Sequence, residues 1–188
     1  IYGDQNYFPA REEHPQNPTS PYGLSKLSAE GYLRFYQEQH NLSTVVLRYS
    51  NVFGPRQNPH SEAGVVAIFC NRLLNGLAPV INGDGKQTRD YVFVGDVVRA
   101  NLIALEPSSS GIFNVGTGRE TSVNELTQSL LKIVGSNIGT EIGEGRDYEQ
   151  RRSCLDYNKI EKSMGWKPKV SLEEGLLETY KFFKKNKL

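Results

Sequence analysis

Residues 20–49 read SPYGLSKLSAEGYLRFYQEQHNLSTVVLRY, and this stretch decides the fold. Ser20 suits a helix N-cap and Pro21 suits the first helical turn, so a helix is predicted from about Pro21 to His40. Its apolar side chains recur at mixed three- and four-residue spacings, as an amphipathic helix requires; they are Leu24, Leu27, Tyr32, Phe35 and Tyr36. The β-branched run at 44–49 then predicts a buried strand. A helix that leads into a buried strand is typical of α/β proteins.

The same alternation continues outward from this stretch. A loop is predicted at 50–56, and further strands are predicted at 79–82, 89–94 and 111–115. Helices are predicted at 63–74 and 96–105, with Asp96 as the N-cap of the second. Two capping boxes open two more helices, at 122–125 and 171–174. The strands are few, short and irregularly spaced, so they indicate an α/β protein whose doubly wound sheet is incomplete.

Composition excludes several classes of function. Of the 188 residues, 37% are hydrophobic and 23% are charged, which suits a globular protein. The formal net charge of +1 gives no general attraction to nucleic acid or to anionic membranes, so neither is expected as a partner. Cys70 and Cys154 are expected to be reduced, mostly buried thiols of a cytoplasmic protein. The histidines and cysteines show no metal-ligand spacing, so no metal is expected.

Tyr22 and Lys26 carry the chemistry that the sequence suggests. Four residues apart on the predicted helix, their side chains share one face. An ammonium group near a phenol stabilises the phenolate and lowers its pKa from the ordinary value of about 10. Such a tyrosine can remove or return a hydroxyl proton near neutral pH. The pair alone is a weak signal, because an ordinary amphipathic helix with an exposed lysine has the same spacing.

Five ordered segments give this pair its context. They read PTSPYGLSK at 18–26, RYSNVFGPR at 48–56, GDGKQTRDYVFV at 83–94, NVGTG at 114–118 and RRSCLD at 151–156. With them, nearly the whole chain resembles the extended short-chain dehydrogenase/reductases, in particular the NAD-dependent nucleotide-sugar epimerases and dehydratases. Within that family the chain is most similar to UDP-glucose 4-epimerases, and the segment NPHSEAGVV at 58–66 weighs most in that comparison.

The resemblance implies an incomplete Rossmann-type fold and a small α/β substrate-binding domain. Residues 1–56 would be the C-terminal remnant of the dinucleotide-binding domain, with the catalytic helix. Residues 57–188 would mostly form the substrate-binding part, with the segment at about 83–115 returning to the main sheet. The chain opens on Ile1 without the glycine-rich cofactor fingerprint, so we expect a fragment that by itself binds NAD poorly and shows no turnover.

The resemblance also implies roles for individual residues. Tyr22 would be the acid/base, and Lys26 would tune it and hold the nicotinamide ribose of NAD. The backbone around Tyr49 and Ser50 would contact the nicotinamide. The UDP-sugar would be bound by Asn51, Val65, Asn82, Arg89, Arg146 and Glu149. Val65 and Asn82 would line the uracil and ribose pocket, and Glu149 would bind the ribose.

Three of these assignments have an alternative interpretation. Arginine supplies the fork geometry that a diphosphate needs, which suits Arg89 and Arg146. Asn51 could instead be a turn residue, Arg89 could pair with its neighbour Asp90, and Arg146 could be a solvated loop charge. The turn at 116–118 is interpreted as structural, because a G-x-G alone is a weak signal.

The implied activity is the interconversion of UDP-glucose and UDP-galactose through a transient 4-keto sugar. A nucleotide-diphosphate-sugar 4,6-dehydratase or a UDP-sugar decarboxylase of the same family is the enzymatic alternative. A non-catalytic sugar-nucleotide-binding module is an alternative from another class. The family resemblance also implies a homodimer, formed through the helix at 21–40 as part of a four-helix bundle. Tyr32, Phe35 and Tyr36 would serve that interface, or equally the core.

Overall fold

Helix α1 and strand β1 are the first two elements of regular secondary structure along the chain. The computed structural model describes the chain except for residues 61–63, 107–108, 146–149 and 187–188. In it, α1 covers Pro21–His40 and β1 covers Val45–Tyr49, close to their predicted positions. The Ser20 hydroxyl accepts a hydrogen bond from the Gly23 N–H at 3.1 Å, which confirms the N-cap. Asn41, in the left-handed conformation at φ 53°, ends the helix.

The other helices follow the predicted order, with one addition. They are α2 (Val65–Leu74), α3 (Val94–Ala104), α4 (Val123–Val134), α5 (Asn158–Met164) and α6 (Leu172–Asn186). Both capping boxes are confirmed, since Ser122 and Ser171 each exchange hydrogen bonds with the glutamate three residues later. Helix α5 is the addition, because its single buried apolar residue, Ile160, gives the sequence no periodicity to detect.

Asp96 is not the N-cap that the sequence predicts. Helix α3 begins at Val94, and Asp96 lies in its first turn, where it is 1% exposed. Its carboxylate accepts hydrogen bonds from the N–H groups of Lys169 and Val170 at 2.9 and 3.1 Å and pairs with Arg99. The prediction was wrong because these partners come from a distant segment. Asp96 instead fixes the chain before α6 to α3.

The strands pair two at a time in the described residues. Strand β1 lies parallel to β6 (Gly111–Val115), with Tyr49 opposite Val115. The remaining pairs are β2 (Asn51–Phe53) parallel to β5 (Tyr91–Phe93), β3 (Val80–Asn82) parallel to β8 (Glu141–Gly143), and β4 (Thr88–Arg89) antiparallel to β7 (Thr121–Ser122). Strands β4 and β5 divide the single strand predicted at 89–94, because Asp90 lies between them.

Strands β1 and β2 form one extended run that changes partner at Ser50. The Ser50 N–H donates to the carbonyl of Val115 at 2.9 Å, whereas the Asn51 N–H donates to the carbonyl of Asp90 at 2.8 Å. The prediction of a loop at 50–56 was therefore wrong for the first half of that segment. Pairing with a strand 40 positions away creates β2, and local sequence does not report such pairing.

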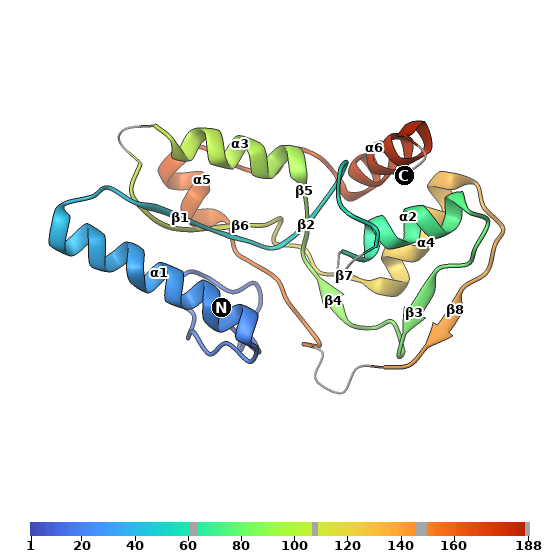
Figure 1. Ribbon diagram of the computed structural model, residues 1–188, viewed down its shortest axis with the longest axis horizontal. Coiled ribbons are helices and arrows are strands. Elements are labelled where there is room, and N and C mark those ends of the chain that lie inside the picture. Colours follow the sequence, from blue (N-terminus) through green and yellow to red (C-terminus); the bar gives the residue numbers. More distant parts are fainter. Residues whose placement is uncertain (61–63, 107–108, 146–149, 187–188) are drawn as a thin grey trace.

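The elements form two lobes on either side of this change of partner. Figure 1 shows α1, β1, β6, α3 and α5 in one lobe and α2, α4, α6, β3 and β8 in the other, with β2 and β5 between them. Each lobe has its own core. Trp166 and Ile160 are fully buried in the first core, and Phe69, Leu126 and Phe183 belong to the second.

Helix α1 is exposed over most of its length. Its buried residues are Gly23 and Glu30. Tyr32, Phe35 and Tyr36 are 69, 53 and 48% exposed, so they are surface residues of this chain and not core residues. Val45, Val46 and Leu47 of the neighbouring β1 are only half-buried.

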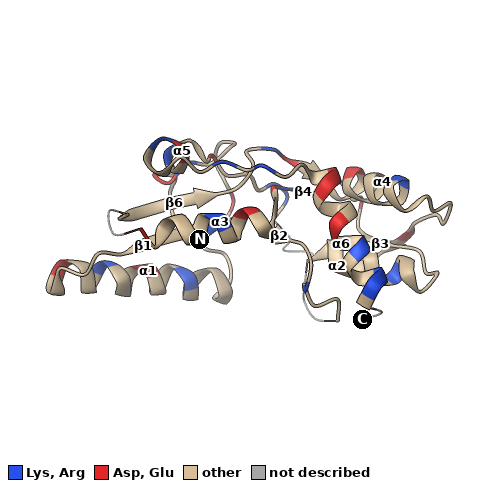
Figure 2. Ribbon diagram, turned by 90° about the horizontal axis from the view of Figure 1, so that it is seen from above, with Lys and Arg blue, Asp and Glu red and all other residues tan. Residues whose placement is uncertain are grey.

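The two cysteines are buried thiols, as the sequence predicts, and the charged side chains are mixed in sign (Figure 2). Cys70 and Cys154 are free and buried, and burial raises the pKa of each thiol to about 12. Figure 2 shows Lys and Arg interspersed with Asp and Glu in both lobes. None of the helices in the described part of the chain combines the length and apolarity that crossing a membrane needs. The described residues likewise contain no cluster of His, Cys, Asp and Glu suited to a metal ion.

Candidate active site

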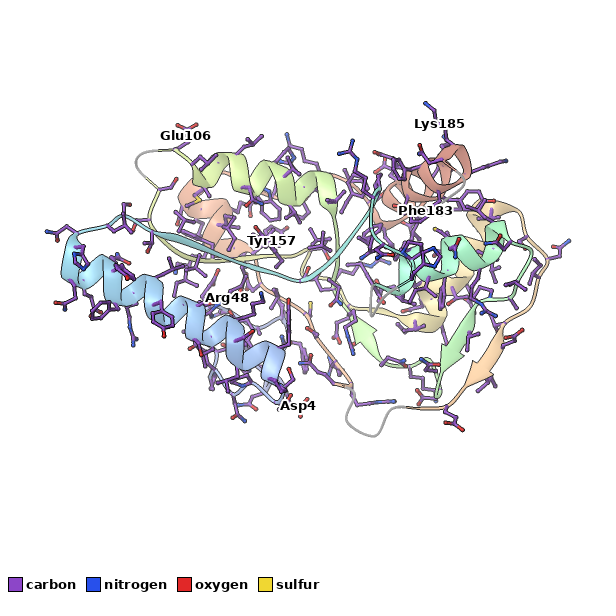
Figure 3. All side chains as sticks on the ribbon, viewed as in Figure 1. Asp4, Arg48, Glu106, Tyr157, Phe183 and Lys185 are labelled. Carbon is purple, nitrogen blue, oxygen red and sulfur yellow. The ribbon has the colours of Figure 1, made fainter. Side chains whose placement is uncertain are left out.

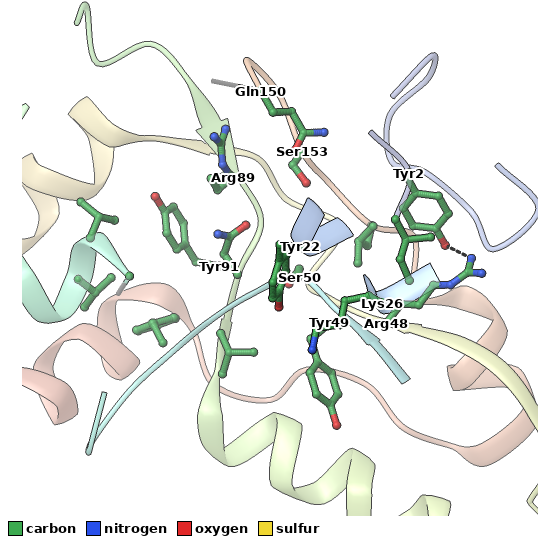
Figure 4. A pocket seen from close by; sticks show the side chains of 18 of the residues that line it. Tyr2, Tyr22, Lys26, Arg48, Tyr49, Ser50, Arg89, Tyr91, Gln150 and Ser153 are labelled. Atoms are coloured by element: carbon green, nitrogen blue, oxygen red, sulfur yellow. Dashed lines mark hydrogen bonds between the residues drawn. The ribbon is translucent and has the colours of Figure 1, made fainter. Parts of the chain in front are cut away.

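A cleft of about 1240 Å³ lies where β1 and β2 change partner. Its walls come from α1, the β1–β2 run, the start of α2, and strands β3 to β5. Of the predicted site residues, the following line it: Tyr22, Lys26, Tyr49, Ser50, Asn51, Val65, Asn82 and Arg89. Figure 4 shows Tyr22 and Ser50 near its centre, Arg89 on one side and Arg48 on the other. Arg146 and Glu149 lie outside the described residues.

The place of the cleft follows from strand topology. Tyr49 ends β1, and the next two N–H groups bind different neighbouring segments. Strands that diverge to different partners leave a gap beyond their carboxyl ends, which is where open α/β sheets bind ligands. The Tyr49 hydroxyl donates to Asn101 Oδ1 at 2.9 Å, and Figure 4 shows its ring directed away from Tyr22. Tyr49 therefore presents its backbone to the cleft.

Tyr22 and Lys26 lie on consecutive turns at the start of α1. The Lys26 Nζ is 5.1 Å from the centroid of the Tyr22 ring, so the ammonium lies next to the phenol. Tyr22 is 73% exposed, and both side chains line the cleft. The arrangement gives a phenol, with a cation beside it, free access to a bound molecule. Proton transfer to or from that molecule is the chemistry that it allows.

Arg89, in β4, lines the cleft from the side opposite the lobe that contains Tyr22 and Lys26 (Figure 4). Its side chain donates to the carbonyl of Thr88 at 2.8 Å. The neighbouring Asp90 is fully buried, and its carboxylate accepts hydrogen bonds from the N–H groups of Thr117, Gly118 and Leu155. Burial raises the pKa of Asp90, and the bonds from Thr117 act against that rise. The carboxylate of Asp90 is thus used in holding the turn at 116–118.

That turn has the structural role predicted from the sequence. Its amides bind the carboxylate of Asp90, and the Thr117 hydroxyl donates to the same carboxylate at 2.6 Å. Gly116 has no room for a side chain, because a Cβ there would lie 2.5 Å from Asp90 Oδ2. The glycines of this turn therefore serve contact with Asp90.

Three buried polar atoms of the described residues have no hydrogen-bond partner. They are Ser50 Oγ, Gln57 Oε1 and Gln87 Oε1, and all three residues line the cleft. An unpaired buried polar atom costs about 1–3 kcal/mol, so three at one place are typical of a site that takes a polar ligand or water. The sequence motifs do not point to Gln57 or Gln87 as site residues, although Gln87 lies in the segment 83–94 that also contains Arg89. The Gln87 amide donates to the carbonyl of Asn82 at 3.2 Å.

Comparison with known proteins identifies the family. The family model described as GDP-mannose 4,6 dehydratase matches residues 1–179. The chain belongs to this family of nucleotide-sugar epimerases and dehydratases. It is 46% identical over 186 residues to a putative UDP-glucose 4-epimerase of Methanocaldococcus jannaschii, covering 99% of this chain and 60% of that protein. It is 36% identical over 193 residues to the dTDP-D-glucose 4,6-dehydratase of Mus musculus, covering 99% and 54%.

Solved structures of the epimerase and dehydratase family share the fold. The UDP-glucose 4-epimerase of Thermotoga maritima, solved with UDP-glucose, superposes with a TM-score of 0.96 at 49% identity, covering 100% of this chain and 61% of that one. The UDP-glucose 4-epimerase of Thermus thermophilus, solved with NAD, superposes with a TM-score of 0.88 at 41% identity, covering 98% and 60%. These likenesses confirm the α/β class and the incomplete Rossmann-type fold. The chain spans about 60% of the length of these epimerases.

Proposed function

We propose that the protein containing this chain is an NAD-dependent UDP-glucose 4-epimerase that interconverts UDP-glucose and UDP-galactose through a transient 4-keto sugar. The observation that carries this proposal is the meeting of Tyr22, Lys26 and Arg89 on one cleft. The cleft joins a proton-transferring pair in one lobe to a diphosphate-binding cation in the other. The 46% identical relative is named a putative UDP-glucose 4-epimerase and the 49% identical solved structure a UDP-glucose 4-epimerase, which supports the choice of reaction.

Tyr22 is the acid/base in the proposed mechanism. Its phenolate takes the proton from the hydroxyl on carbon 4 of the sugar. After the keto sugar has rotated in the site, the phenol returns a proton to the carbon 4 oxygen. The Lys26 ammonium, 5.1 Å from the ring centroid, stabilises the phenolate between these steps. Proton transfer of this kind contributes about 10²- to 10⁴-fold to a rate.

NAD is the cofactor of the proposed reaction. When bound, it would supply the reversible hydride transfer at carbon 4 of the sugar. The residues present fit its nicotinamide end, because Lys26 offers donors to ribose hydroxyls and Ser50 Oγ is a buried atom without a partner in the described structure. Tyr22 and the backbone of Tyr49 complete the set that would hold this end of NAD.

The UDP-sugar would lie across the cleft toward β3, β4 and α2. Arg89 would bind the diphosphate with the paired donors of its guanidinium. Asn51 would contact the sugar, and Val65 and Asn82 would line the uracil and ribose pocket. Arg146 and Glu149 complete the proposal as a second diphosphate ligand and a ribose ligand.

The proposal extends to the domain organisation, the oligomeric state and the cellular location of the protein. Residues 1–56 belong to the cofactor domain and residues 57–188 mostly to the substrate domain, with the segment at about 83–115 returning to the main sheet through β5 and β6. The protein works as a homodimer through α1, whose Tyr32, Phe35 and Tyr36 are exposed. Two free cysteines suit a cytoplasmic protein, because reducing compartments keep thiols free.

Two other functions are alternatives to the epimerase. Similarity to the mouse dTDP-D-glucose 4,6-dehydratase supports a dehydratase or a decarboxylase on the same scaffold. A non-catalytic sugar-nucleotide-binding module is the alternative from another class. Calorimetric titration of the chain with UDP-glucose and, separately, with NAD tests the module. We expect neither ligand to bind tightly, and tight binding of UDP-glucose without NAD would favour the module.

Product analysis separates the enzymatic alternatives. The full protein is incubated with NAD and, in separate reactions, UDP-glucose, dTDP-glucose or UDP-glucuronic acid, and the products are identified by chromatography and mass. Epimerisation leaves the mass unchanged, dehydration removes one water, and decarboxylation of a UDP-glucuronic acid substrate removes carbon dioxide. We expect UDP-galactose from UDP-glucose and no loss of water. Loss of water without UDP-galactose would contradict the epimerase.

A further inference from the structure

One buried ion pair anchors the exposed helix α1. Arg48 of β1 holds the carboxylate of Glu30 with two hydrogen bonds, from Nε to Oε1 at 2.8 Å and from Nη2 to Oε2 at 2.6 Å. The two side chains are 4 and 9% exposed. This fork-to-fork contact fixes distance and angle together, which a single hydrogen bond does not. It therefore sets the orientation of the helix as well as its position.

Glu30 lies on the same face of α1 as the proposed acid/base pair. Tyr22, Lys26 and Glu30 are spaced four residues apart, so their side chains form one row along the helix. All three line the cleft. A rotation of α1 about its axis that breaks the contact of Glu30 with Arg48 would also turn Tyr22 and Lys26 away from the cleft.

The rest of α1 offers few buried groups to resist such a rotation. Gly23 is its other buried residue, and it has no side chain. The aromatic side chains of the following turns are exposed. The pair of Glu30 and Arg48 is therefore the main buried side-chain contact between the described part of α1 and the sheet.

Arg48 is itself held from several sides. Its Nη1 donates to the Tyr2 hydroxyl at 2.8 Å and to the carbonyl of Glu12 at 3.1 Å (Figure 4 shows the bond to Tyr2). The Tyr2 hydroxyl in turn donates to Asn114 Oδ1 of β6 at 2.7 Å. Figure 3 shows Arg48 between α1 and the neighbouring strands β1 and β6. A buried network in which each group is satisfied is rigid, so Arg48 is a fixed reference point for α1.

We propose that Glu30 and Arg48 are positioning residues that hold α1 in the rotation at which Tyr22 and Lys26 face the cleft. The inference rests on the proposed acid/base role of Tyr22. Neither residue needs to touch substrate for this role. Their effect on the reaction passes through the helix.

The decisive variant replaces the pair with apolar residues of similar size. In the double variant Glu30→Leu with Arg48→Met, the fold keeps its packing, because buried ion pairs are often exchanged for apolar side chains without loss of stability. The angular constraint on α1 is lost. The matched control is Glu38→Leu with Arg34→Met, which removes an exposed pair of the same helix whose side chains are 63 and 78% exposed.

The experiment measures kcat and KM for UDP-glucose epimerisation by the full protein, with the folded fraction of each variant determined by circular dichroism. We expect the buried double variant to lose on the order of 10- to 100-fold in kcat, with KM changed less than about threefold, because misplacement of reacting groups lowers the rate more than binding. The control pair should leave kcat and KM unchanged.

A failure of the positioning role can be told apart from a failure of the proposed function. If Tyr22→Phe removes activity while the buried double variant keeps its kcat, the positioning role is wrong and the acid/base role stands. A merely structural role would lower kcat only in proportion to the loss of folded protein, and that result also contradicts the positioning role. Should the double variant not fold, Glu30→Gln, which keeps the shape of the side chain, is measured in its place, with a loss of kcat at nearly constant KM expected and an unchanged kcat contradicting it.

Discussion

Thr117 Oγ1 donates a hydrogen bond to Asp90 Oδ1 at 2.6 Å, and this bond ties the residue next to Arg89 to the turn after β6. The same carboxylate also accepts the N–H groups of Gly118 and Leu155. Three segments distant in sequence therefore meet at one buried charge. The charge is tolerated there because several donors satisfy its lone pairs.

Replacing Asp90 with Ala should destabilise the protein strongly. The donors of Thr117, Gly118 and Leu155 would lose their acceptor, and that of Leu155 is buried, so the free energy of unfolding should fall by about 3–5 kcal/mol. Urea unfolding of the full protein, followed by circular dichroism, measures this loss. The control is Asp84→Ala, which removes an exposed pair with Arg151 and should cost far less. Equal losses in the two variants would refute the role assigned to the Asp90 cluster.

Replacing Arg89 with Ala should weaken the binding of UDP-glucose. A charge-assisted hydrogen bond contributes about 1.5–3 kcal/mol, which corresponds to roughly 10- to 100-fold in Kd. Calorimetric titration of the full protein measures Kd. The difference in Kd between the wild type and the Arg89 variant should become smaller as the salt concentration rises. Arg119→Ala, an exposed arginine outside the cleft, is the control. Unchanged affinity in the Arg89 variant would remove this arginine from the substrate site.

The capping box of α4 should make stability depend on pH. Hydrogen bonds from Ser122 hold the pKa of Glu125 below its usual range. Since the folded pKa is the lower one, the contribution of Glu125 to stability is present above the unfolded value of about 4.3 and is lost as the pH falls through the folded value. The free energy of unfolding of Glu125→Gln should therefore be lower than that of the wild type at pH 7, and the two values should be much closer at about pH 3. The exposed Glu178→Gln is the control, and a difference for Glu125→Gln that persists undiminished at low pH would contradict the assignment.

The exposed aromatic side chains of α1 should form the dimer interface. Phe35 and Tyr36 are 53 and 48% exposed, and a charge placed there would be buried without a partner in an interface. The double variant Phe35→Glu with Tyr36→Glu should sediment as a monomer, whereas the full wild-type protein should sediment as a dimer. Leu105→Glu, at a position 79% exposed on the far side of β1, is the control and should remain dimeric. A dimeric double variant would place the interface elsewhere.

Local signals allowed much of the fold to be predicted, and long-range pairing accounts for the rest. The N-cap at Ser20 and the capping boxes at Ser122 and Ser171 depend on neighbours within a few residues, so the sequence reports them directly. Strands β2 and β8 have three residues each and exist through pairing with distant strands. The amphipathic pattern of α1 shows which face is apolar and not what covers it. For that reason the aromatic residues proved exposed and the charged Glu30 proved buried.

The candidate site likewise contains residues that the sequence predicted and residues that only the folded structure revealed. The four-residue spacing led to Tyr22 and Lys26, and the family resemblance led to Arg89. The structure places all three around one cleft. Gln57, Gln87 and the pair of Glu30 with Arg48 were not found, because their significance lies in burial and in partners from other segments. Hydrogen-bond satisfaction is a property of the folded chain, so no motif encodes it.

The rate of UDP-galactose formation from UDP-glucose by the Tyr22→Phe variant of the full protein tests the central claim most directly. The substitution removes one hydroxyl from a side chain that is 73% exposed, so the fold should be unaffected. Tyr32→Phe, on the same helix, serves as the control and should keep wild-type activity. The account predicts that kcat of the Tyr22 variant falls by about 10²- to 10⁴-fold. Formation of UDP-galactose at the wild-type rate by that variant would contradict it.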